Sequence, residues 1–141
     1  MIHVREIDHL VLRVVNLDRM LAFYTEVLGC SIERREDEMG LIQLRAGHSL
    51  LDLVPVGSPL GRAGGGPPGK DARNLDHFCF RVDPFDEKAI RRHLESRGVA
   101  AGELASRFGA EGCGPSLYIS DPEGNVVELK GAPWPAASSG R

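Results

Sequence analysis

Apolar and polar residues follow the same order of patterns in both halves of the chain. The first half has the patterns of a strand, a helix and three further strands, in residues 7–15, 17–28, 31–36, 40–46 and 50–54. Alternation along the first of these strands places His9 and Arg13 on the same face. Asn16 is the expected N-cap of the helix, and Gly29 is the expected residue just beyond its end.

The second half repeats this order. Strand patterns are expected at residues 76–82, 99–103, 116–120 and 126–130, with a helix after the first of them. His77 and Arg81 share one face of the first strand. Asp83 is the expected helix cap, Pro84 suits the first helical position, and Gly98 ends the helix.

A repeated heptapeptide aligns the two halves. The segment DHLVLRV at residues 8–14 returns as DHFCFRV at residues 76–82. Such self-similarity indicates a duplicated structural unit. The predicted fold class is therefore α+β, with duplicated βαβββ modules forming a cupped mixed sheet.

The chain is expected to form one domain over residues 1–141. Module 1 covers about residues 5–56 and module 2 about 74–131, with a flexible tail at 132–141. The Gly- and Pro-rich stretch at 57–73 has no periodic apolar pattern and is interpreted as a flexible linker. The alternative interpretation of this stretch is a loop that covers a substrate.

Composition and charge limit the kinds of partner and the cellular compartment that we expect for this protein. The formal net charge of −3 gives no basic surface for nucleic acid, and no apolar run suits a membrane span. The N-terminus leads directly into a strand pattern without the apolar stretch of a signal peptide. The three cysteines have no CxxC spacing, so we expect a reduced, cytoplasmic protein that acts on a small molecule.

Four residues form a candidate metal-ligand set. His9 and His77 occupy matched positions of the repeat, while Asp52 and Glu128 are acidic residues inside the otherwise apolar last strand of each half. A carboxylate in such a strand needs a partner or a metal. Two imidazoles and two carboxylates suit one divalent ion of Fe, Mn, Ni, Co or Zn.

Other roles are open for some of these residues. A single histidine on a strand is usually structural, and Asp52 is equally suited to pair with Arg13 or Arg81. Inside a cup those two guanidinium groups would need Asp52, Glu128 or an anionic ligand beside them. Cys79 shares the face of His77 and is interpreted as a small core residue rather than a reactive thiol.

Several motifs resemble the vicinal oxygen chelate superfamily, the glyoxalase, bleomycin resistance and extradiol dioxygenase fold. They are DHL at 8–10, AFYTEVLG at 22–29, His77, and DPEGNVVE at 121–128. The resemblance runs from about residue 7 to 130. It implies metal ligands at His9, His77 and Glu128, and glyoxalase-type members add an acid where Asp52 stands. Many members are homodimers, so the resemblance also implies a homodimer.

Three functions compete under this resemblance. The preferred one is a glyoxalase-like lyase or isomerase, in which Glu128 and Asp52 are catalytic carboxylates and the substrate chelates the metal through oxygens. A second is an Fe(II) extradiol-type dioxygenase or a fosfomycin-type thiol transferase. The third is a non-catalytic, drug-resistance-type binding protein. The residues predicted to bind substrate are Arg13, Arg81, Arg107 and Tyr118.

Overall fold

A computed structural model describes residues 1–136 of the chain. The predicted flexible tail extends into residues 137–141, which lie outside the described residues. The chain divides into two compact units, Met1–Asn74 and Leu75–Arg141. Each unit contains one copy of the predicted module.

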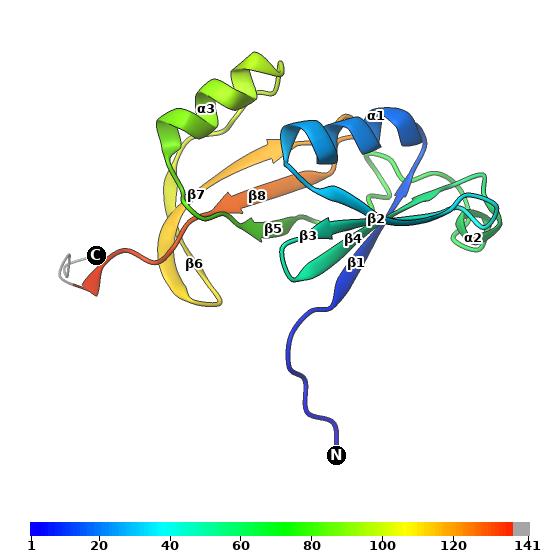
Figure 1. Cartoon of the computed structure of the whole chain (residues 1–141), viewed down its shortest axis with the longest axis horizontal. Coiled ribbons are helices and arrows are strands. Elements are labelled where there is room, and N and C mark those ends of the chain that lie inside the picture. The colour runs from blue at the N-terminus through cyan, green and yellow to red at the C-terminus, as the bar shows by residue number, and fades with distance from the viewer. Residues whose placement is uncertain (137–141) are drawn as a thin grey trace. The chain divides into compact units, whose positions relative to one another are not determined.

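The first unit is built on a four-stranded mixed sheet (Figure 1). Its strands lie in the order β1-β4-β3-β2; β1 is parallel to β4, and the other neighbours are antiparallel. Helix α1 (Leu17–Ala22) and the π-helical turn η1 (Phe23–Val27) connect β1 to β2, and the short helix α2 (Pro59–Arg62) follows β4. The strands are β1 (His9–Val14), β2 (Ser31–Glu36), β3 (Leu41–Ala46) and β4 (Ser49–Pro55).

Alternation along the strands sets the two faces of this sheet. Leu12, Val14, Leu51 and Leu53 point to one face and are buried in the core. The side chain of Asn16 accepts a hydrogen bond from the Arg19 amide, which confirms the predicted N-cap. The other face is therefore the one on which His9 and Asp52 lie.

The predicted helix over 17–28 changes its hydrogen bonding halfway along. Its second part is π-helical, and the Thr25 hydroxyl donates to the Leu21 carbonyl at 2.8 Å. A threonine hydroxyl that bonds back to the preceding turn competes with the regular ladder. The spacing of apolar residues thus predicted where the helical segment begins and ends. It did not predict that the second part is a π-helix.

The second unit repeats this topology. Its strands lie in the order β5-β8-β7-β6, with β5 parallel to β8 and the other neighbours antiparallel. Helix α3 (Glu87–Ser96) lies on one side of this sheet (Figure 1). The strands are β5 (Phe78–Arg81), β6 (Ala105–Gly109), β7 (Gly112–Ser120) and β8 (Val126–Lys130). The predicted duplication of a β-α-β-β-β unit is confirmed.

Two details of the second half differ from the prediction. The expected strand at 99–103 is absent, and β6 begins at Ala105, because residues 100–102 are Ala-Ala-Gly and have little strand propensity. The helix cap is Asp86, which accepts from the Ala89 amide at 3.1 Å, and not Asp83. Asp83 and Pro84 both lie before the helix, which begins at Glu87.

The DPEGN motif forms the turn between β7 and β8. One Asp121 oxygen accepts from the amides of Glu123 and Asn125, and the other accepts from the Asn125 side chain. Asp121 and Asn125 are buried. The turn thereby fixes the pairing that places Tyr118 opposite Glu128.

The stretch at 57–73 is fastened to β1. The Arg13 guanidinium donates to three carbonyl oxygens of this stretch, those of Gly61, Gly65 and Gly66. Gly64 lies against the same guanidinium, and a Cβ atom there would overlap it. The stretch is therefore attached to unit 1 along part of its length.

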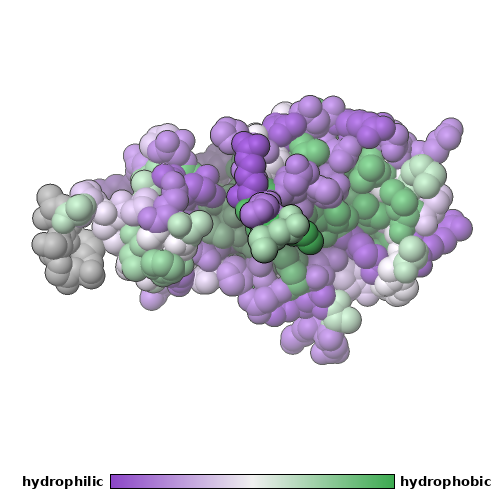
Figure 2. Space-filling view, turned by 90° about the horizontal axis from the view of Figure 1, so that it is seen from below, coloured by the Kyte–Doolittle hydropathy of each residue, from purple (hydrophilic) through white to green (hydrophobic). Residues whose placement is uncertain are grey.

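The face of the protein shown in Figure 2 is mostly hydrophilic, with apolar side chains between the polar ones. Exposed apolar residues include four in the N-terminal segment and one at the β6–β7 hairpin, namely Met1, Ile2, Val4, Ile7 and Phe108. Among residues 1–136, no helix combines the length and the apolar character needed to cross a membrane.

Candidate functional site

His9 and Asp52 lie on the same face of the first sheet. His9 begins β1, and Asp52 on β4 is the register partner of Val11, two residues further along β1. The His9 Nδ1 atom lies 2.7 Å from an Asp8 carboxylate oxygen. This hydrogen bond raises the pKa of His9, and the charge of Asp52 acts in the same direction.

The carboxyl group of Asp52 is buried and is hydrogen-bonded to the side chain of Gln43. The residue is 3% exposed, and the Gln43 amide nitrogen lies 3.3 Å and 3.4 Å from its two oxygens. Burial raises the pKa of Asp52, while the Gln43 hydrogen bond and the nearby His9 lower it. Asp52 is thus paired with Gln43 rather than with an arginine.

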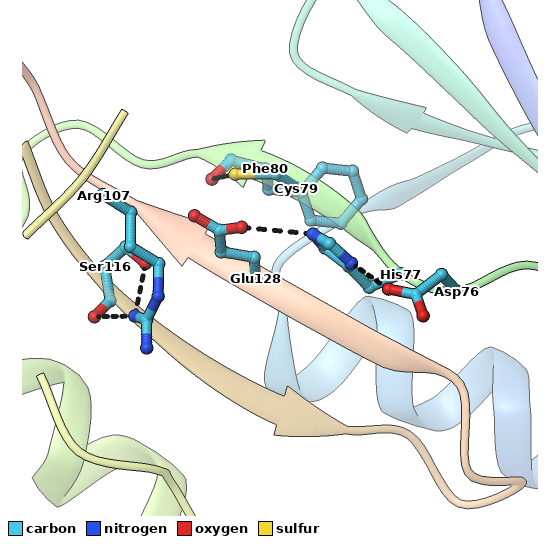
Figure 3. A network of polar contacts seen from close by, with 7 residues as sticks. All are labelled: Asp76, His77, Cys79, Phe80, Arg107, Ser116 and Glu128. Carbon is cyan, nitrogen blue, oxygen red and sulfur yellow. Dashed lines mark hydrogen bonds and ion pairs between the residues drawn. The ribbon is translucent and has the colours of Figure 1, made fainter. Parts of the chain in front are cut away.

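The second unit contains the matching arrangement (Figure 3). The His77 Nδ1 atom lies 2.6 Å from an Asp76 oxygen, and its Nε2 atom lies 3.4 Å from Glu128 Oε1. Glu128 is buried on β8. His77 therefore stands between a carboxylate that orients its ring and a carboxylate on the face of the sheet.

These contacts fit the ligand chemistry of a divalent ion. A neutral imidazole that donates from Nδ1 to an aspartate has its lone pair on Nε2, and metal-bound histidines usually have such an orienting carboxylate. Two ligand atoms, each about 2.1 Å from one ion at a tetrahedral angle, lie about 3.4 Å apart. The separation of 3.4 Å between His77 Nε2 and Glu128 Oε1 agrees with this value.

Each unit brings together two of the four predicted ligands. In unit 1 the charges of His9 and Asp52 each shift the pKa of the other group. In unit 2 His77 contacts Glu128. Within residues 1–136 the structure contains no group of three or more His, Cys, Asp or Glu side chains that could hold a metal. On its own, each unit supplies one histidine–carboxylate pair.

Tyr118 and Arg107 lie beside the second pair. The Tyr118 ring meets the His77 ring edge to face, with 5.4 Å between centroids. Arg107 lies over the Tyr118 ring at 4.4 Å and donates to the carbonyl and hydroxyl oxygens of Ser116. Figure 3 shows Glu128 between His77 and the Arg107–Ser116 pair. The structure thus places both predicted substrate-binding residues near Glu128.

Arg13 and Arg81 have contacts other than those expected. Arg13 donates to loop carbonyls, as described above, and Arg81 donates to Glu111 at 2.7 Å and to the Val82 carbonyl. Neither is hydrogen-bonded to Asp52 or Glu128 in the described residues. The acceptors of the Arg13 Nη atoms are backbone carbonyl oxygens, and residue types alone do not reveal such acceptors. A role for these arginines in substrate binding stays a prediction.

Cys79 is exposed, contrary to its interpretation as a core residue. It lies opposite Glu128 in the β5–β8 register. Partial burial of its sulfur, followed by the charge of Glu128, raises the pKa of its thiol to about 11. Cys79 is therefore a protonated thiol at neutral pH.

Sequence reasoning missed the supporting residues Asp8, Asp76 and Gln43. The two aspartates were visible as part of the repeated heptapeptide, directly before each histidine. That repetition was a usable signal for an orienting partner. Gln43 had no comparable signal, because its role depends on the β3–β4 register.

The fold and the site together define a class of protein. Its members have a duplicated βαβββ unit, and each unit carries a histidine–carboxylate pair. The chain belongs to the Glyoxalase/Bleomycin resistance protein/Dioxygenase superfamily, whose family model matches residues 6–129.

The chain is similar to individual proteins with different names and lengths. The chain is 30% identical over 128 residues to the glyoxalase domain-containing protein RDO1 of Mycosarcoma maydis, covering 89% of this chain and 68% of RDO1. It is 30% identical over 129 residues to the metapyrocatechase of Pseudomonas sp. (strain CF600), covering 86% of this chain but 36% of that enzyme. The crystal structure of virulence protein STM3117 from Salmonella typhimurium is similar, with a TM-score of 0.76 at 26% identity. This match covers 93% of this chain and 99% of that one.

Proposed function

We propose that the protein is a divalent-metal-dependent enzyme, a glyoxalase-like lyase or isomerase whose small substrate chelates the metal through oxygens. The observation that carries this proposal is the pair of Asp–His couples, Asp8–His9 and Asp76–His77, each with its Nδ1 atom bonded to the aspartate. An exposed histidine with a merely structural role has no need of this arrangement at both matched positions.

The proposed ligands are His9, Asp52, His77 and Glu128. These four residues are the ligand set of the proposal, which also makes the protein a homodimer. Nitrogen and oxygen donors of this kind suit Fe, Ni, Mn, Co or Zn. A second carboxylate distinguishes this set from the two-histidine, one-carboxylate triad of non-haem Fe(II) oxygenases, and it favours the lyase or isomerase over the dioxygenase.

A bound metal would supply Lewis acidity to two oxygens of the substrate. The chain's own residues would orient the substrate and move the proton. Asp52, held by Gln43 on one side, is proposed to take a proton from the carbon next to a substrate carbonyl and to return it. Tyr118 and Arg107 would contact the remainder of the substrate near Glu128.

The first experiment measures the metal content of the purified protein. We expect about one first-row metal ion per chain in the wild type and its loss in His77→Ala. The matched control is His93→Ala, which removes an exposed histidine from α3. A wild-type protein that takes up none of Fe, Ni, Mn, Co or Zn would contradict the proposal and favour a non-catalytic binding protein.

The second experiment detects proton transfer directly. The metal-loaded protein is incubated in D₂O with hydroxyacetone, and deuterium exchange next to the carbonyl is followed by NMR. We expect exchange in the wild type and its loss in Asp52→Asn with the metal still bound. Equal exchange in both proteins would remove Asp52 from the proposed role.

A dioxygenase is the second candidate. The contact between the Tyr118 and His77 rings places a phenol beside a proposed ligand, and the metapyrocatechase is similar over part of its length. Oxygen consumption by the Fe(II)-loaded protein with catechol tests this candidate. Uptake of oxygen that is lost in Tyr118→Phe would favour it over the lyase or isomerase.

A further inference from the structure

Arg13 and Arg81 occupy the same position of the repeated heptapeptide. Each follows the candidate histidine of its unit, His9 or His77, by four residues. Alternation along a strand places both arginines on the face of the sheet that carries the proposed metal ligands, here called the ligand face. The arginine therefore marks the same place on both ligand faces, at the opposite end from the histidine.

In unit 1 the chain segment 61–66 covers the arginine end of the ligand face. The Arg13 Nη atoms donate to three carbonyl oxygens of this segment, those of Gly61, Gly65 and Gly66, at 2.9, 2.7 and 3.0 Å. The backbone at Gly64 lies so close to the guanidinium that a Cβ atom there would overlap it. Segment 61–66 thus lies against the Arg13 side chain, on the side of the sheet that carries the proposed ligands.

In unit 2 the β6–β7 hairpin covers the same end. Arg81 donates to the carboxylate of Glu111, in the turn of this hairpin, at 2.7 Å. Lys130, the register partner of Arg81, donates to the Gly112 carbonyl at 2.9 Å. A Cβ atom at Gly109 would lie 2.9 Å from the Cε atom of the same lysine. Because register partners share a face, hairpin residues 109–112 bend over the ligand face.

The two units close this end with different segments. The covering segment of unit 1 follows β4, the last strand of its sheet, whereas that of unit 2 joins β6 to β7. Backbone carbonyls bind Arg13, and a side-chain carboxylate binds Arg81. The features common to both units are thus the arginine and the closed end of the ligand face. This indicates that the closed end itself has a function.

The closed end limits the space beside the proposed ligands. The register places each arginine level with the residue two positions beyond the acid of its unit, Val54 beyond Asp52 and Lys130 beyond Glu128. Two residues of a strand span about 7 Å. A molecule bound at either acid therefore has about this length along the strand before it meets the covering segment. A methyl group fits this space, whereas an extended octyl chain is too long for it.

We propose that Arg13 and Arg81 are positioning residues, each of which holds a covering segment over the end of its ligand face, and that the closed ends restrict the substrate to a short chain beyond its metal-chelating oxygens. The anchoring belongs to each unit by itself, and the statement about the substrate rests on the proposed function. In this role the arginines act on the substrate through the covering segments.

Amide hydrogen exchange of the metal-free, full-length protein tests the anchoring. Exchange at residues 61–66 should become about tenfold faster in Arg13→Met, and exchange at residues 109–112 about tenfold faster in Arg81→Met. Arg92→Met removes an exposed arginine from α3 and is the matched control. Melting curves establish that each variant is folded. Unchanged exchange in either folded variant would overturn the anchoring.

Binding of hydroxamates to the Zn²⁺-loaded protein tests the limit on substrate length. A hydroxamate chelates a metal ion through two oxygens, and its alkyl chain can be varied. We expect the wild type to bind acetohydroxamate about tenfold more tightly than octanohydroxamate, as measured by calorimetry. Arg13→Met and Arg81→Met should each reduce this preference while the affinity for acetohydroxamate stays the same. General destabilisation would instead weaken both compounds alike.

The outcomes separate this inference from the proposed function. A protein that takes up metal but binds the two hydroxamates equally would overturn the length limit and leave the metal site in place. The wild-type preference in either folded arginine variant would overturn the role of the covering segments. A protein that takes up no metal would contradict the proposed function, and the statement about the substrate would fall with it. The exchange experiment decides the anchoring in every case.

Discussion

Adjacent residues create the orienting contact of each candidate histidine. Asp8 and Asp76 accept from the Nδ1 atoms of His9 and His77 at 2.7 Å and 2.6 Å. Neither contact depends on a distant part of the chain. Each aspartate is also exposed, so its contribution to metal binding can be tested with little change in the core.

Loss of this contact should weaken metal binding. Asp76→Asn keeps the size of the side chain but removes its charge, and we expect metal affinity to fall about 10- to 100-fold. Titration of the apo protein with Zn²⁺ or Ni²⁺ measures the change. Asp71→Asn, at an exposed position of the loop, is the matched control and should bind as the wild type does. Unchanged affinity in Asp76→Asn would exclude a supporting role.

Cys30 should resist thiol reagents. Its burial raises the pKa of the thiol to about 11, so the group stays protonated and unreactive at pH 8. Labelling of the native protein with a maleimide, read by mass spectrometry, should modify the exposed Cys113 and leave Cys30 unmodified. Modification of Cys30 becomes expected only when the protein is unfolded or as the pH approaches 11. Rapid labelling at pH 8 would contradict the burial.

At the level of the elements, Arg13 joins β1 to the stretch at 57–73. Three carbonyl oxygens accept from its guanidinium, and the backbone of Arg13 is itself bonded to the Asn74 side chain in both directions. A glycine at position 64 lets the guanidinium lie against the loop. The attachment therefore depends on both the arginine and the absence of a side chain at position 64.

Gly64→Ala should loosen this loop. The added Cβ atom would overlap the Arg13 guanidinium, so the loop or the arginine must move. We expect tryptic cleavage after Arg62 to become about tenfold faster, which corresponds to the loss of roughly 1.4 kcal/mol of local stability. Gly57→Ala, where an added Cβ atom meets nothing within 4 Å, is the matched control. Equal cleavage rates in both variants would show that the attachment is weak.

The sequence predicted most helices and strands. It missed the segments in which apolar and polar residues do not alternate. The pattern of apolar residues predicted the strands β1, β4 and β8. Asp52 and Glu128 were predicted as candidate metal ligands because each is an acid within an apolar strand. The first part of β7 was missed because glycine and proline there carry no alternating pattern. The contacts of Arg13 were missed because its acceptors are backbone atoms, which every residue has.

For the whole molecule, metal binding should raise the free energy of unfolding. An ion that binds only the folded chain stabilises it by about 2.7 kcal/mol when present at 100 times its dissociation constant. We expect the Tm to rise on metal addition in the wild type and to stay constant in His9→Ala and in His77→Ala. His48→Ala, at an exposed turn, should respond as the wild type does. A normal response in His9→Ala would confine the metal to ligands of the second unit.

The Asp–His contact also bears on how such a protein can arise. Ligand and orienting group are neighbours in the sequence at residues 8–9 and again at 76–77, so a tandem copying event that doubled the module delivered both together. A ligand whose support came from a remote loop would have needed that loop to be copied and refitted as well. After the doubling, each half was free to diverge without losing the geometry of its histidine. Grafting the same dipeptide onto the start of an edge strand in another sheet would therefore transfer an oriented imidazole in two residues.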